Sequence, residues 1–151
     1  MATRYDEAQR RRLAAFRITH DEVESLSDHS GFARTRLSAL LEALMPRFAP
    51  WPEVAEALAR PEVHRARVDH WTRVASGALG EGFAESARRL ATAFHRNGIE
   101  GHAVAICHSI VVEGVAEELG LDAAPPARGG LFGLGGGGAG QASKAALRGL
   151  L

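Results

Sequence analysis

Apolar positions in the first 120 residues recur at intervals of three and four, which is the spacing of one helix face. Ala, Leu, Arg and Glu dominate this region and are good helix formers, and strand-type alternation is absent. The pattern therefore predicts an all-α fold. Caps, prolines and glycines divide it into seven helices. The first three are expected over about 5–16, from a capped start at Thr19 or His20, and over 31–44. A short helix follows Pro52, the next runs from Pro61 to near Gly77 or Gly80, another ends at Asn97-Gly98, and the last covers 99–119.

The composition changes sharply after Pro125 and Pro126. Residues 127–140 are rich in glycine and low in complexity, and residues 141–151 start a new amphipathic helix in which the sequence stops. We predict one domain over 1–124, a Pro/Gly-rich linker or loop over 125–140, and the start of a final, truncated helix over 141–151. An apolar helix this short is marginal alone, so we expect the chain to be part of something longer.

Composition and charge narrow the class of protein. The 151 residues include 18 Lys and Arg and 18 Asp and Glu, so the formal net charge is zero and a nucleic-acid-binding surface is not expected. No apolar leader follows Met1, and the longest apolar stretch, 103–112, is too short to cross a membrane. Together with the single Cys107, these features predict a cytoplasmic protein that binds neither nucleic acid nor membrane.

The seven histidines are the main candidates for chemistry. Their spacing fits no zinc motif, and one cysteine cannot build a cysteine-rich metal cluster. The chain has no nucleophile elbow, no phosphate-binding glycine motif and no paired carboxylates, so we expect no enzyme. A heme site with one axial histidine remains an alternative, because heme iron needs only one imidazole in an apolar slot. A lone histidine on a helix is, however, more often a surface residue or a satisfied core residue.

Several short motifs follow one another in the order and spacing of a known family. The stretches RLAAFRITHDEVESL at 12–26 and WPEV at 51–54 come before His70-Trp71. After this pair come Ser76-Gly77, Phe83, Ser86, Arg89-Leu90, Arg96, Gly98-Ile99 and Glu100. Over about 10–120 the chain resembles the globin-coupled sensors, or protoglobin family, and residues 142–151 resemble the start of the family's final helix.

The resemblance implies a globin-like helical sandwich with an extra N-terminal helix. Such domains bind heme, sense oxygen or another diatomic gas, and pass the signal to an attached chemotaxis or second-messenger output module. The resemblance also implies a homodimer paired through the last two long helices, here 99–119 and 141–151. Apolar residues that we expect to serve this pairing are Val104, Ile110, Val111 and Val115.

The two positions that carry iron chemistry in the family are different in this chain. Aligned without a gap, the family's proximal histidine falls on Phe94, and His95 follows one residue later, 100° further around a helix. The family's distal tyrosine falls on Met45, beside Leu44. The resemblance therefore leaves the binding of heme open.

Two interpretations follow from the resemblance. In the first, a π-bulge or an early helix end lets His95 ligate the iron, with His102 as a substitute, and the distal side donates no hydrogen bond to bound oxygen. In the second, the pocket is filled and the domain is a heme-free sensor globin that signals through another ligand or through packing. The residues expected around the heme, or in its place, are Leu44, Met45, Phe48, Trp71, Leu90 and Phe94.

The remaining candidate side chains are expected to be structural. We expect His70 to point outward from Trp71, and His64 and His108 to lie at the helix surface or at an interface. We expect Cys107 to be a small buried apolar side chain.

Overall fold

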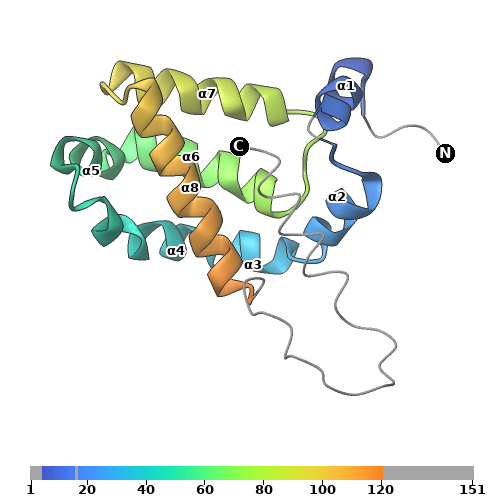
Figure 1. Ribbon diagram of the computed structural model, residues 1–151, viewed down its shortest axis with the longest axis horizontal. Coiled ribbons are helices and arrows are strands. Elements are labelled where there is room, and N and C mark those ends of the chain that lie inside the picture. The colour runs from blue at the N-terminus through green and yellow to red at the C-terminus, as the bar shows by residue number, and fades with distance from the viewer. Residues whose placement is uncertain (1–4, 16, 121–151) are drawn as a thin grey trace.

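The computed structural model describes residues 5–15 and 17–120, which form helices joined by short turns and contain no strand (Figure 1). The predicted linker at 125–140 and the helix start at 141–151 lie outside the described residues, as does the end of the predicted domain at 121–124. The described elements are α1 (Glu7–Ala15), α2 (His20–Ser27), α3 (Ser30–Thr35), α4 (Leu37–Ala43), the 3-10 helix η1 (Met45–Phe48), α5 (Pro52–Ala59), α6 (Pro61–Ala75), α7 (Phe83–Arg96) and α8 (Gly101–Glu118).

Local sequence signals set most of the helix ends. Thr19 caps α2, because its hydroxyl accepts from the backbone N–H of Glu22 while the Glu22 carboxylate accepts from the backbone N–H of Thr19. Pro52 and Pro61 occupy the first turns of α5 and α6, where a missing N–H costs nothing. Gly98, with φ of 74°, follows the end of α7. These predicted boundaries are confirmed.

The helix predicted over 31–44 is divided into α3 and α4 at Arg36, whose φ of −120° lies outside the helical range. The Thr35 hydroxyl donates to the carbonyl of Gly31 at 2.8 Å. A threonine that bonds back to the preceding turn bends a helix, and this bond ends α3 one residue before the break. No glycine or proline marks this break in the sequence, so the pattern of apolar residues did not show it.

α6 and α7 form an antiparallel pair, joined by a loop over 76–82 (Figure 1). Three hydrogen bonds between side chains cross the pair or its ends: Arg60 to Asn97 at 2.7 Å, Arg89 to Asp69 at 3.0 Å, and His70 with Ser86 at 3.1 Å. Gly77, with φ of 64°, begins the loop, and a Cβ there would lie 2.5 Å from the carbonyl oxygen of Val23. Only glycine lets the end of α6 come this close to α2.

α8 crosses α6 and reaches α4 at its far end (Figure 1). The rings of Trp71 on α6 and His108 on α8 have centroids 5.3 Å apart. A Cβ at Gly114 would lie 2.7 Å from a methyl group of Leu44, so glycine is needed for α8 to approach α4. The described helices thus have the all-α, globin-like sandwich arrangement that the sequence predicts.

One cluster of buried side chains joins α2, α4, η1 and α5 to α6, α7 and α8. A smaller cluster of Ile18, Val23 and Leu79 connects the N-terminal region to the loop after α6, with Tyr5 and Leu13 packed against it. α1 buries none of its residues, so this extra N-terminal helix lies at the periphery of the fold. None of the described helices has the length and apolar character needed to cross a membrane.

Candidate functional site

The six residues expected around a heme, or in its place, meet in the main core. Leu44, Phe48, Trp71, Leu90 and Phe94 are buried members of the cluster, and the half-buried Met45 packs against them. They come from η1 and its N-terminal flank, from α6 and from α7. The six side chains therefore belong to one core cluster, and their role around a ligand stays a prediction.

The backbone of α7 turns Phe94 inward and His95 outward. The side chain of Phe94 is 2 % exposed, whereas that of His95 is exposed to solvent. α7 is regular α-helix through Arg96, without a π-bulge, and the backbone N–H of Ile99 donates to the carbonyl of Phe94 at 3.0 Å. His102 is also exposed. A phenyl ring has no ligand atom, so in this arrangement α7 offers the core no axial ligand, and the residues present do not fit heme ligation from α7.

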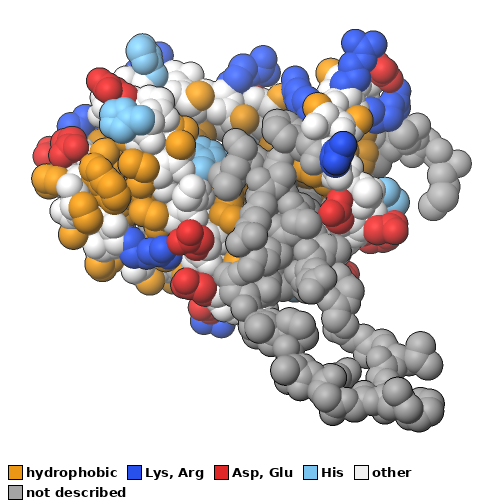
Figure 2. Space-filling model, in the orientation of Figure 1, with side chains coloured by type: hydrophobic (Ala, Val, Ile, Leu, Met, Phe, Trp, Pro, Cys, Tyr) orange, Lys and Arg blue, Asp and Glu red, His pale blue; other side chains and the backbone are white. Residues whose placement is uncertain are grey.

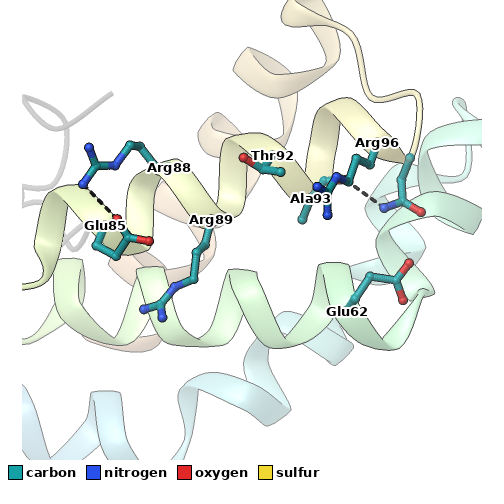
Figure 3. Close-up of a pocket in the computed structure, with 8 residues that line it drawn as sticks. Glu62, Glu85, Arg88, Arg89, Thr92, Ala93 and Arg96 are labelled. Atoms are coloured by element: carbon teal, nitrogen blue, oxygen red, sulfur yellow. Dashed lines mark hydrogen bonds and ion pairs between the residues drawn. The ribbon is translucent and has the colours of Figure 1, made fainter.

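The outer side of the α6–α7 pair carries a shallow charged groove of about 690 Å³ (Figure 3). Arg88 pairs with Glu85 along α7 at 2.8 Å, and Arg89 extends toward α6, where it contacts Asp69. The groove is lined by Glu62, Glu85, Arg88, Arg89, Thr92, Ala93, Arg96 and Asn97. Charged, solvent-facing walls of this kind do not suit an apolar macrocycle, so the groove is not the slot expected from the sequence.

A buried arginine lies where the sequence predicted only apolar residues. The Arg67 side chain on α6 is 1 % exposed. Its Nη1 donates to the sulfur of Met45 at 3.8 Å, and its Cζ lies 6.0 Å from the centre of the Phe48 ring. Its Nη2 has no hydrogen-bond partner among the described residues. A hydrogen-bond donor that the sequence analysis did not include therefore lies beside Met45 and Phe48.

The described contacts of Arg67 do not neutralise its charge. Burial raises the pKa of the nearby Cys107 thiol to about 11, against the opposing effect of Arg67, so the thiol is uncharged at neutral pH. Burial also lowers the pKa of Arg67 itself. Removing an ion from water costs several kcal/mol, and a contact with an aromatic ring returns only about 1 kcal/mol. The described contacts of Arg67 thus do not offset the free-energy cost of burying its charge.

The sequence did contain a signal for Arg67. Val63, Arg67, Trp71 and Val74 follow one another at intervals of four, four and three, so they share one face of α6. All four side chains are buried. A charged residue is normally assigned to the surface, and the sequence analysis gave Arg67 no role.

His70 is buried, so the expectation that it points outward from Trp71 is wrong. Its side chain is 7 % exposed because α7 covers this side of α6. The hydroxyl of Ser86 donates to the carbonyl of Phe83 at 2.7 Å and therefore accepts from Nδ1–H of His70 at 3.1 Å. This leaves the lone pair of the imidazole on Nε2. Burial, with a smaller effect from His108, lowers the pKa of His70 to about 4, so the ring is neutral at pH 7.

His108 on α8 is half-buried and also lies beside the Trp71 ring. Its Nδ1–H donates to the carbonyl of Val104 at 2.9 Å, which again leaves the lone pair on Nε2. Burial lowers its pKa, and the positive charge of Arg67 adds to this effect. Cys107, the preceding residue, is buried as predicted. Two neutral imidazoles therefore flank one indole, but the described residues include no group of three or more potential ligands that could hold a metal ion.

Comparison with known proteins gives one result. The protoglobin family model matches residues 6–128 of the chain, which is most of its length. Searches of curated proteins and of solved structures found no match. The matched range contains all the helices of the described fold and every side chain of the candidate site.

Proposed function

This chain belongs to the protoglobin family, and we propose that it is a sensory domain whose core responds to a ligand other than histidine-ligated heme. The observation that carries the proposal is the register of α7. Phe94, on which the family's proximal histidine falls in the ungapped alignment, is buried, while His95 faces solvent. The described helix would have to rotate by about 100° to exchange them.

The packing of α6 against α7 supports the same proposal. The bonds Arg60–Asn97 and Asp69–Arg89 and the buried pair of His70 with Ser86 hold the two helices in direct contact along their length. A planar macrocycle between them would break at least the buried pair and leave its polar atoms without partners, which costs about 1–3 kcal/mol for each unpaired group. These bonds therefore favour direct packing of α6 against α7, with no ligand between the two helices.

Signal output is the second part of the proposal. We infer that the domain acts as a homodimer, paired through α8 and the helix that starts at 141–151, and regulates an attached output module. Ile110, Val111 and Val115, expected to form the pairing surface, are buried in the core, so they are not available for it. Pairing would instead use the exposed face of α8, on which Ala105 and Ser109 lie.

The pairing has its own test. Light scattering of the whole chain is expected to give twice the monomer mass, and Ala105→Arg is expected to give monomer. Glu81→Arg, an exposed change in the loop before α7, is the matched control and should leave the mass unchanged. A monomeric wild-type chain would contradict the pairing.

A second candidate is the usual function of the family, gas sensing through heme. The neutral imidazoles of His70 and His108, each with its lone pair on Nε2, favour it, because this is the form that ligates metals. Bound heme would supply an iron that takes up a diatomic gas. Helix α7 would have to move away from α6 before His70 could ligate the iron.

Titration with hemin tests both candidates. The heme-free proposal predicts that the purified chain gives no sharpened Soret band that shifts on reduction. If such a band appears, its loss in His95→Ala, with His102→Ala as the matched exposed control, would establish the ligand predicted from the resemblance. Loss in His70→Ala or His108→Ala alone would establish the second candidate. Either result would contradict the heme-free proposal.

A further inference from the structure

The strongest unexplained feature of the core is the guanidinium of Arg67. It is fully buried, its only side-chain hydrogen bond to a described residue goes to a thioether, and its Nη2 has no described partner. We propose that Arg67 binds the carboxylate of an amphipathic ligand, a monoanion with a hydrocarbon body, which enters the core beside Met45 and Phe48. This inference rests on the proposed function, because it assumes a core without heme.

The single positive charge of the site favours a ligand with a single negative charge. Among the described residues, the buried polar side chains are Arg67, His70 and Ser86. His70 is neutral, as argued above, and Ser86 carries no charge, so within the described part of the chain the Arg67 guanidinium is the only buried cation. A doubly charged phosphate would remain half neutralised, whereas a carboxylate is matched charge for charge.

The shape of the donor group also favours a carboxylate. The two terminal nitrogens of a guanidinium form a planar fork that binds both oxygens of one carboxylate. Among the described residues, Nη1 of Arg67 has only the Met45 sulfur as a partner, and Nη2 has none. A thioether is a weak acceptor, so a carboxylate displaces it easily. Both donors then gain a charged partner.

The surroundings favour an apolar body on the ligand. The Phe48 ring and the Met45 side chain flank the guanidinium, and both pack in the main apolar cluster. Met45 is only half-buried, so the cluster borders solvent on its side. Its flexible, unbranched side chain can change rotamer to admit a ligand. Figure 2 shows apolar side chains at the surface over α4 and α5, the helices on either side of η1.

Binding at this point would connect two parts of the fold. Arg67 belongs to α6, and Met45 and Phe48 belong to η1, which follows α4. A carboxylate on Arg67 whose chain takes the place of Met45 would move η1 relative to α6. α4 and α8 meet at Leu44 and Gly114, so a shift of η1 reaches the helix that we infer forms the dimer.

Calorimetric titration of the whole chain tests the proposal, with decanoate as the probe at pH 7 and below its aggregation concentration. Decanol has the same chain without the charge, and acetate has the charge without the chain. We expect decanoate to bind at least about tenfold more tightly than either, because the site needs both a charge-assisted bond and apolar contact. Equal binding of decanol would overturn the role of the charge, and equal binding of acetate would overturn the role of the hydrocarbon body.

Variants locate the site. Arg67→Met is expected to weaken decanoate at least about tenfold. Arg65→Met, which removes an exposed arginine from the same helix, is the matched control and should bind like the wild type. Equal affinity of Arg67→Met and wild type would overturn the assignment. If Arg67→Met does not fold, Arg67→Lys replaces it, and the expected result is weaker binding, because an ammonium cannot form the two-point contact.

The two proposals fail in different ways. If neither decanoate nor hemin binds, the carboxylate site is wrong and the heme-free assignment stands. If hemin binds with a Soret band that shifts on reduction, the proposed function is wrong. Decanoate that binds only to wild type and Arg65→Met supports both.

Discussion

Phe94 and His95 are neighbours on α7, yet Phe94 is buried in the core and His95 is exposed to solvent. One step along a helix turns a side chain by 100°, and on α7 this step carries the side chain from the core to the solvent. The relationship decides which of the two interpretations of the sequence the fold favours. It also makes a simple prediction for stability.

Phe94→Ala is expected to lower the free energy of unfolding by about 3–5 kcal/mol, because it leaves a cavity among Trp71, Leu90 and their neighbours. His95→Ala should change it by less than about 0.5 kcal/mol, since an exposed side chain loses few contacts. Urea denaturation followed by circular dichroism measures both. Equal losses, or a larger loss for His95→Ala, would show that α7 has a different register.

Arg67 gives a second prediction, in the opposite direction. Arg67→Met removes a buried charge that no described group neutralises and keeps most of the side-chain volume. We expect the free energy of unfolding to rise by about 1–3 kcal/mol. Arg65→Met, at an exposed position, should stay within about 0.5 kcal/mol of the wild type. A clear loss of stability in Arg67→Met would mean that the guanidinium has a stabilising partner that the described contacts lack.

The buried His70 predicts a dependence of stability on pH. Its pKa in the folded chain is about 4, below the ordinary value of 6.5, so the unfolded chain takes up a proton first as the pH falls. The contribution of the neutral ring is complete above pH 6.5 and is lost between about pH 6.5 and pH 4. At pH 4.5 the loss amounts to about 2–3 kcal/mol for this group alone.

The measurement is urea denaturation at pH 7 and at pH 4.5. His70→Gln should lose markedly less stability between the two pH values than the wild type does. His108, whose pKa is also lowered, keeps part of the dependence in this variant. His102→Gln serves as the exposed control and should behave like the wild type. A dependence as steep in His70→Gln as in the wild type would contradict the burial of a neutral His70.

The sequence predicted the fold where local chemistry determines it. The Thr19 cap, Pro52, Pro61 and the Asn97-Gly98 stop act within a few residues, and each appears in the structure as expected. The break at Arg36 was missed, because it depends on one hydroxyl of Thr35 bonding back along α3. A hydroxyl that bends a helix has no distinct signature in a pattern of apolar spacing.

The candidate site was predicted in part. The residues that the resemblance implies around the heme, among them Phe94, Leu90 and Trp71, are buried in one cluster. The polar residues of the same region, Arg67 and His70, were assigned outward or left out, because their burial depends on α7 and η1 covering α6 from two sides. Only tertiary contacts reveal that coverage. A polar residue at an apolar position of the helix repeat is therefore a better indication of a site than its chemical type alone.

The most direct test of the central claim is the heme content of the chain purified from cells with an ample heme supply, measured as the pyridine hemochrome. If Phe94 fills the place of the family's ligand, the chain should carry only a trace of heme, and Phe94→His, which restores an imidazole at the inward position, should carry more. One heme per wild-type chain, retained through purification, would contradict the account.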